Sequence, residues 1–200
     1  TPYNRLSSWI GGTAREHSVE FFTSNYDLLM EEASEHANIP FFTGFSGSYE
    51  PFFDPATIAN SDELPPKWAR LWKLHGSLGW GLNSNDELIS GKGREATELI
   101  YPDHLKYDHI QKLPYTALFE RLRKFLMTPD TLLLSCGFSF NDAHISAVIS
   151  EALAANPSAS VFGFLYKALE EEKAAKKISL TRPNFSAYAS DKAVISCVEG

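Results

Sequence analysis

Cysteine is almost absent from this 200-residue sequence, which holds only Cys136 and Cys197. Neither belongs to a Cys-x-x-Cys pair, so the sequence excludes a four-cysteine zinc module and no metal site is expected. Isolated cysteines of this kind are typical of reduced thiols inside the cell. We therefore expect a cytoplasmic location.

Long hydrophobic runs are also missing. No apolar stretch approaches about 20 residues, the length of a membrane-spanning helix, so no membrane partner is expected. The start of the sequence, Thr1-Pro2-Tyr3-Asn4, has neither a signal peptide nor an initiator methionine. We therefore expect the chain to begin inside a longer protein.

Positive charge is outweighed by negative charge, with 18 Lys and Arg against 25 Asp and Glu and a net charge of -7. An acidic chain repels a phosphate backbone, so direct nucleic-acid binding is not expected. A local basic pocket for a small anionic ligand remains open. Hydrophobic residues make up 44% of the chain, which is enough for one packed domain over residues 1–200.

Short apolar runs alternate with helical patterns along the chain. This order predicts an α/β fold, with a doubly wound, mostly parallel Rossmann-like sheet and helices on both faces. Strands are predicted at 19–22, 69–75, 131–136, 160–166, 185–188 and 193–197. Helices are predicted at 3–10, 26–37, 113–126, 140–153 and 170–177. The regions 38–66 and 78–112 are expected to form an insertion or small subdomain, the first a long loop and the second a hairpin over 78–90 with a short strand at 99–101.

Three of the predicted strands end in the same way, because each apolar run gives way to small or polar residues. The three ends are Thr23-Ser24-Asn25, His75-Gly76-Ser77 and Gly137-Phe138-Ser139. In open α/β sheets ligands bind outside the carboxyl ends of the strands, so these groups are expected to converge on one crevice. Glycine lets a ligand approach the backbone closely. The helix that follows Ser139 is expected to offer free backbone N–H groups to an anion or a ribose hydroxyl.

Several of these residues also have a purely structural interpretation. Asn25 could be the N-cap of the following helix, and the sequence favours the cap and the site equally. His75 could be a strand-end histidine bonded to a nearby carbonyl, although the glycine that follows it favours a functional role. Ser139 and Asp142 match an N-terminal capping box, and Asp27 is most simply a partner of the helix dipole.

Two other features are interpreted as structural. Gly11 and Gly12 follow a helix-like stretch rather than a strand, so they do not match a dinucleotide fingerprint and are interpreted as a plain loop. Trp68, Trp72 and Trp80 flank the His75 strand and are interpreted as core or interface residues.

Taken together, these motifs resemble the sirtuin-like domain of bacterial anti-phage defence proteins. The resemblance rests on Thr23-Ser24-Asn25-Tyr26-Asp27, on Lys73-Leu74-His75-Gly76-Ser77, and on the run from Gly137 to Asp142. The closing segments 184–188 and 191–195 are similar to the end of that domain. The match extends over most of the chain from about residue 18 onward.

The resemblance implies an NAD glycohydrolase that breaks the nicotinamide–ribose bond and so depletes NAD in an infected cell. Carried over by position, Asn25 would hold the ribose and the attacking water, and His75 would be the general base. Gly137 and Ser139 would contact the adenosine side, and Asp27 is the acid of its motif without an assigned role. The cofactor-binding residues expected in this way are Thr23, Ser24, Asp27, Gly76, Gly137, Phe138, Ser139 and Asp142.

That chemistry suits the residue types. The oxocarbenium-like ribose needs polar neighbours and excluded water. A neutral imidazole can accept a proton near neutral pH, and an asparagine amide can orient a hydroxyl and a water together.

The sequence departs from the family in two respects. The glycine-rich phosphate loop of the first strand has no match, so that strand is expected upstream of Thr1. The cysteine-based zinc module of deacetylating sirtuins is missing, which favours the glycohydrolase branch. Two alternatives stay open: a non-catalytic sensor that binds NAD or ADP-ribose, and an assembly domain that forms a homo-oligomer or binds a partner defence protein.

Overall fold

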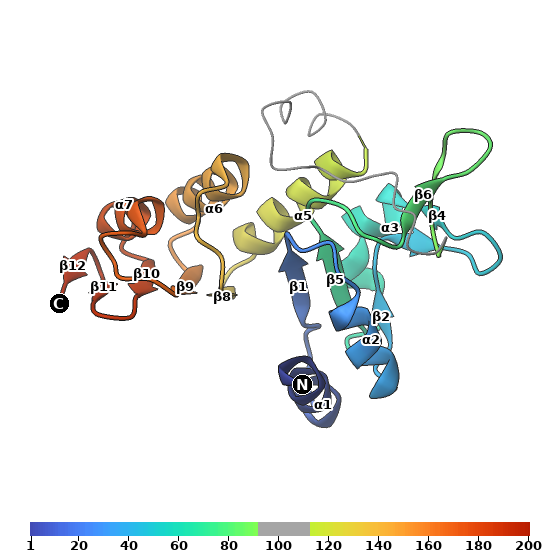
Figure 1. The fold of residues 1–200 in the computed structure, drawn as a ribbon, viewed down its shortest axis with the longest axis horizontal. Coiled ribbons are helices and arrows are strands. Elements are labelled where there is room, and N and C mark those ends of the chain that lie inside the picture. The colour runs from blue at the N-terminus through green and yellow to red at the C-terminus, as the bar shows by residue number, and fades with distance from the viewer. Residues whose placement is uncertain (92–112) are drawn as a thin grey trace. The chain divides into compact units, whose positions relative to one another are not determined.

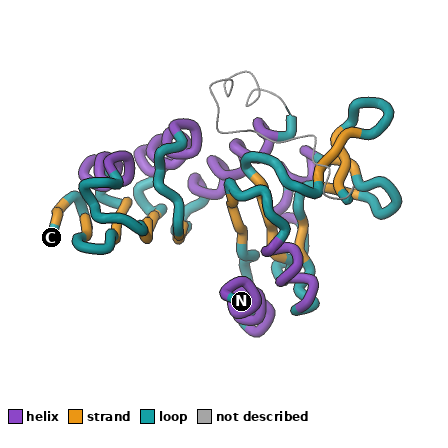
Figure 2. Tube along the Cα trace, in the orientation of Figure 1, coloured by secondary structure: helices purple, strands orange, loops and turns teal. Residues whose placement is uncertain are grey.

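The computed structural model describes residues 1–91 and 113–200, and Figures 1 and 2 show its helices and strands. The chain divides into two compact units, Thr1–Leu118 and Phe119–Gly200. The fold is mixed α/β, because helices accompany both parallel and antiparallel strand pairs. This division into two units does not test the prediction of a single domain over residues 1–200. The single domain therefore stays a prediction.

The first unit contains a three-stranded parallel sheet with β5 at its centre (Figure 1). Its strands are β1 (Glu20–Thr23), β5 (Ala69–Lys73) and β2 (Phe41–Phe42), in the order β1-β5-β2. All five residues of β5 are buried, because the strand has a parallel neighbour along each edge. The strands predicted at 19–22 and 69–75 are confirmed.

Two helices lie against each other in this unit. Helix α1 (Pro2–Gly12) begins after Thr1, whose hydroxyl accepts a hydrogen bond from the Asn4 amide at 3.3 Å. Gly11 and Gly12 form the last turn of this helix, so their interpretation as a loop is wrong. Helix α2 (Leu29–His36) starts three residues later than the predicted 26–37.

The region predicted as a long loop over 38–66 contains regular structure. Besides β2 it holds β3 (Phe45–Ser46), β4 (Phe52–Phe53), the short helix α3 (Pro55–Ala59) and the 3-10 turn η1 (Ser61–Glu63). Asp54 begins α3, because its carboxylate accepts from the Thr57 amide at 3.1 Å. Strands this short carry almost no periodicity, which is why the sequence pattern did not show them.

The hairpin predicted over 78–90 is confirmed. Strands β6 (Trp80–Leu82) and β7 (Leu88–Ser90) pair antiparallel. Strand β7 also pairs with β4, with Phe52 opposite Ile89, so a four-stranded sheet has the order β3-β4-β7-β6. The strand predicted at 99–101 lies outside the described residues.

The second unit is built on a five-stranded sheet in the order β12-β11-β10-β9-β8. Strands β8 (Leu132–Cys136), β9 (Ser160–Phe164) and β10 (Phe185–Tyr188) are parallel neighbours. Strands β11 (Ala193–Ile195) and β12 (Val198–Glu199) add an antiparallel hairpin. The strands predicted at 131–136, 160–166, 185–188 and 193–197 are therefore confirmed, with small shifts at their ends.

Helices α6 (Ala143–Ala155) and α7 (Lys173–Thr181) belong to this second unit. Helix α5 (Tyr115–Met127) confirms the helix predicted at 113–126. The boundary between the two units falls within this helix. Figure 2 shows the helices in purple beside the strands in orange. Because parallel strands occur in two separate sheets, the doubly wound Rossmann-like arrangement stays a prediction.

A cluster of aromatic rings packs the core of the second unit. Phe140 and Phe185 meet edge to face, with ring centroids 5.1 Å apart. Gly163 leaves room for both rings, since a Cβ there would lie 3.3 Å from each. The almost purely apolar sequence of β8 is typical of a strand buried on both faces, but Leu132 and Leu134 are 50% and 57% exposed. Among the described residues β8 is an edge strand with β9 as its partner, and this position explains the difference.

Candidate functional site

The carboxyl ends of β1 and β5 lie at the same edge of the three-stranded sheet (Figure 1). In their parallel pairing Thr23 lies opposite Lys73. The ladder continues one step further, because the Leu74 amide donates to the Thr23 carbonyl at 2.8 Å. Both strands therefore leave the sheet side by side.

The loops that follow the two strands stay joined. The Leu78 amide donates to the Tyr26 carbonyl at 2.9 Å. This bond and the bond from Leu74 to Thr23 enclose two short segments, one that contains Asn25 and one that contains His75. The structure thus brings the two predicted catalytic residues to neighbouring loops at one sheet edge.

A tight turn follows β5 and carries His75. Gly76 has a φ of +96° and its amide donates to the Lys73 carbonyl at 3.2 Å. This left-handed conformation strains any residue with a Cβ, which accounts for the glycine. The buried Ser77 hydroxyl accepts from the Gly79 amide at 3.2 Å. His75 itself is half-buried and lies in this turn, one residue before Gly76.

Asn25 is exposed at the edge of the sheet. Its backbone amide donates to the Thr23 hydroxyl oxygen at 3.1 Å, so Thr23 shapes the loop. No hydrogen bond joins the Asn25 side chain to another residue in the part of the chain that the structure describes. Ser24, between them, is half-buried. The Asn25 amide group is therefore available to a ligand.

The N-cap interpretation of Asn25 is wrong. Helix α2 begins at Leu29, and its N-cap position is Leu28, which has no side-chain cap bond. The carboxylate of Asp27 accepts from the Leu29 amide at 3.1 Å. Asp27 thus supports the helix start as its sequence position suggested, and Asn25 lies in the preceding loop.

A buried ion pair beneath these loops has no signal in the sequence. The Lys73 side chain is 2% exposed, and its Nζ lies 3.0 Å from Oε1 of Glu31 in α2. The same Nζ donates to the backbone carbonyl of Asp27. Both faces of β5 are buried, so the strand carries this charge inside the sheet.

Burial raises the pKa of the Glu31 carboxyl above its ordinary value, and the positive charge of Lys73 acts in the opposite direction. The second carboxylate oxygen, Oε2, is buried and has no hydrogen-bond partner among the described residues. The pair is therefore held in a poorly solvated environment, where a directed ionic contact is stronger than at the surface.

The third predicted strand end lies in the second unit. Gly137 follows β8 with a φ of +71°, and its amide donates to the Phe164 carbonyl at 3.3 Å. Phe140 also has a positive φ, of 59°, and its ring is buried against Phe138 and Phe185. Such a conformation costs free energy in a bulky residue, and the buried ring holds the loop in place.

The capping box predicted with Ser139 is wrong. Asp142 itself is the N-cap of α6, and its Oδ1 accepts from the amides of His144 at 3.0 Å and Ile145 at 3.1 Å. The free N–H groups expected there for an anion are thus partly occupied by a carboxylate. His144 lies in the first turn of the helix.

Two of the three predicted strand ends are joined by strand pairing. Strands β1 and β5 belong to the three-stranded sheet, and β8 belongs to the five-stranded sheet of the second unit. The convergence of all three on one crevice stays a prediction.

Of the three tryptophans near the His75 strand, Trp72 and Trp80 are buried and Trp68 is 37% exposed. Trp72 is fully buried and donates to Glu20 Oε2 at 2.7 Å, in agreement with a core role. Cys136 and Cys197 are free thiols. In residues 1–91 and 113–200 no group of three His, Cys, Asp or Glu side chains is arranged to hold a metal ion. Within the same ranges, no helix has the length and hydrophobicity needed to cross a membrane.

The sequence was also compared with known proteins. The family model described as "SIR2-like domain" matches residues 19–187, which is more than half of the chain. The matched range includes the loops after β1, β5 and β8. A comparison with curated proteins finds no match.

Proposed function

The chain belongs to the SIR2-like domain family, and from this premise we propose that it binds NAD and hydrolyses the bond between nicotinamide and ribose. The family includes NAD-dependent enzymes. The observation that supports the proposal is the pairing of β1 with β5, which brings Asn25 and His75 to adjacent loops. Sheet edges of this kind are where α/β proteins bind ligands.

Each residue has a proposed role that follows from its chemistry. Nicotinamide leaves as a neutral ring with the electron pair of the C–N bond, and positive charge develops on the ribose. The oxygen of a water forms the new bond to C1′, and its proton passes to the His75 imidazole and then to solvent. The Asn25 amide, which is exposed, orients the water and a ribose hydroxyl. The products are ADP-ribose, nicotinamide and a proton.

Other residues of the predicted site receive supporting roles. Thr23 and Asp27 shape the loop that carries Asn25, through their bonds to the amides of Asn25 and Leu29. Gly76 lets the His75 turn form. Ser24 contacts the ligand from the same loop.

For the second unit we propose that Gly137, Phe138 and Ser139 contact the adenosine side of the dinucleotide. The support is the left-handed turn at Gly137, around which a Cβ would find no atom within 4 Å. Asp142 acts indirectly, since its carboxylate caps α6.

The proposal extends to the biological setting. Hydrolysis of NAD in a bacterial cell under phage attack would deplete the dinucleotide and halt growth, and a homo-oligomer or a partner defence protein would control the activity. The resemblance of the motifs around Asn25, His75 and Gly137 to defence-associated domains is the support for this setting.

The test is nicotinamide release from NAD by the purified full-length protein. His75→Ala and Asn25→Ala are each expected to lower kcat by about 10² to 10⁴-fold, the range measured for loss of acid–base and orienting groups. Ser139→Ala is expected to raise KM instead. The matched controls are His36→Ala and Asn85→Ala, which change exposed residues away from the sheet edge.

Equal turnover by the wild type and His75→Ala would remove the assigned base. NAD binding measured by calorimetry without nicotinamide release would replace the enzyme with a sensor of NAD or ADP-ribose.

A further inference from the structure

Lys73 is the last residue of β5, and its charge is almost fully withdrawn from water. Its side chain is 2% exposed, and the residue lies opposite Thr23 in the parallel ladder. A buried ammonium group requires partners, because its desolvation is otherwise unfavourable. The partners that it has therefore indicate what the residue holds in place.

Those partners lie in the loop after β1 and in helix α2, which follows that loop. The Lys73 Nζ donates to the backbone carbonyl of Asp27 and forms an ion pair with Glu31 at 3.0 Å. Asp27 lies two residues after Asn25, and Lys73 lies two residues before His75. One ammonium group thus links the strand that leads to His75, the loop that carries Asn25 and the first turn of α2.

Stability alone does not explain such a pair. An apolar pair of similar volume often holds a buried position at least as well, because desolvating two charges offsets much of their attraction. An apolar side chain cannot, however, donate a hydrogen bond to the Asp27 carbonyl. The directed bond to the loop is the feature that only the lysine supplies.

We propose that Lys73, held by Glu31, is a positioning residue that aligns the Asn25 loop with His75. This inference rests on the proposed function, in which both of these side chains act on NAD. The backbone bonds from Leu74 and Leu78 hold the loop at Thr23 and Tyr26, and the lysine holds the next residue, Asp27, where the loop leads into α2. Loss of the bond would leave the fold intact and let Asn25 move relative to the imidazole.

The experiment compares three variants of the full-length protein. Lys73→Met removes the ammonium and keeps an apolar stem. Glu31→Gln keeps an acceptor for the lysine. The double variant Lys73→Met/Glu31→Leu removes both charges, so it avoids an unpaired buried carboxylate and is expected to fold even where Lys73→Met does not. The matched control is Lys192→Met/Glu199→Leu, which removes a Lys–Glu pair with 49% and 28% side-chain exposure.

Two readouts are measured on each variant. Hydrogen exchange of the amides from Asn25 to Leu28 is expected to be about tenfold faster in the double variant, while the β1 and β5 ladder amides keep their protection. Its kcat for NAD is expected to fall by about 10²-fold with little change in KM, because misplacing a reacting group by about 1 Å has that effect. Glu31→Gln is expected to lie between this variant and the wild type, and the surface control to match the wild type in both.

Unchanged exchange in the double variant overturns the proposal, whatever its turnover. Faster exchange with wild-type turnover overturns it as well, since the loop would then move without effect on the reaction. If the wild type itself releases no nicotinamide, the proposed hydrolase function fails. The exchange measurement needs no NAD, and it then decides by itself whether Lys73 holds the loop.

Discussion

Arg70 is a charged residue at the centre of the parallel sheet, with 1% of its surface exposed. Its guanidinium donates to the carbonyls of Ser61 at 2.6 Å, Leu64 at 2.9 Å and Pro65 at 3.2 Å, and also to that of Trp68. Arginine suits this role because its planar group directs several N–H donors at once. One side chain thus anchors the end of the 38–66 region to β5.

We predict that Arg70→Lys destabilises the protein by about 2 to 4 kcal/mol. A lysine amine cannot reach all of these carbonyls, and each buried acceptor that loses its donor carries a penalty. Urea unfolding measures the change, with Arg5→Lys on the exposed surface of α1 as the control, expected within about 0.5 kcal/mol of the wild type. Identical unfolding midpoints for the two variants would contradict the anchoring role.

Asn25 shows what residue-scale reasoning from sequence could and could not decide. Its position after an apolar run marked it as a candidate for the site, and the same position suited a helix cap. The choice depended on where α2 begins, and that start is set by the contacts of Asp27 and Lys73. A local pattern cannot contain a contact to a distant strand.

At the scale of elements, the end of α1 offers a matched pair of glycines. A Cβ at Gly11 would lie 2.2 Å from Cδ1 of Ile39, and a Cβ at Gly12 would meet no atom within 4 Å. Both residues are exposed and helical. Substituting each glycine in turn therefore separates the effect of helix propensity on stability from the effect of packing.

Gly12→Ala is expected to stabilise the protein by up to about 1 kcal/mol, the difference between glycine and alanine in a helix. Gly11→Ala is expected to stabilise the protein less than Gly12→Ala does, or to destabilise it, because the Ile39 side chain must move. Thermal unfolding followed by circular dichroism compares the two variants. Equal stabilisation by both would show that Ile39 yields at no cost.

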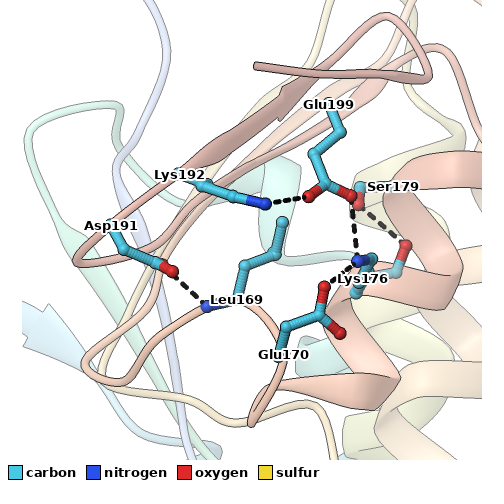
Figure 3. A network of polar contacts seen from close by, with 7 residues as sticks. All are labelled: Leu169, Glu170, Lys176, Ser179, Asp191, Lys192 and Glu199. Atoms are coloured by element: carbon cyan, nitrogen blue, oxygen red, sulfur yellow. Dashed lines mark hydrogen bonds and ion pairs between the residues drawn. The ribbon is translucent and has the colours of Figure 1, made fainter.

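The β11–β12 hairpin is linked to α7 by a partly exposed charge network, shown in Figure 3. Glu199 pairs with Lys192 at 2.8 Å and with Lys176 at 2.9 Å, and Lys176 also pairs with Glu170. The hydrogen bonds from Lys192 and then Lys176 lower the pKa of Glu199 to about 2 from the ordinary 4.5. The ionised carboxylate is thus favoured by the folded state.

The sign of the pH dependence follows from this lowered pKa. The stabilising contribution of Glu199 is complete above pH 4.5 and is lost as the pH falls from 4.5 towards 2. Glu199→Gln is expected to lower the Tm slightly at pH 7, less so at high salt, and the difference is expected to shrink in that acidic window. Differential scanning calorimetry from pH 7 to pH 2 measures it.

The control for this series is Glu171→Gln, which changes an exposed carboxylate in the turn before α7. Its Tm is expected to follow the wild type at every pH. A constant difference between Glu199→Gln and the wild type across the acidic window would contradict the role of the network.

At the scale of the whole molecule, two features join segments that are far apart in the sequence. The 38–66 and 78–112 regions were expected to be an insertion, and strands from both form one antiparallel sheet through the pairing of β4 with β7. The loops of Asn25 and His75 meet through the pairing of β1 with β5. Neither pairing has a signal in local periodicity, because partner choice depends on contacts between distant residues.

The amino-acid sequence alone determined the mixed α/β class, most of the strands and helices, and the motifs that place the chain in its family. These depend on hydrophobic periodicity and on short motifs, which are local properties. Only the tertiary structure decided that Asn25 is not a helix cap, that Asp142 caps α6, and that Lys73 and Arg70 are buried. The physical reason is that burial and hydrogen-bond partners are set by neighbours in space, and a charged side chain looks the same in the sequence whether it meets water or a carbonyl.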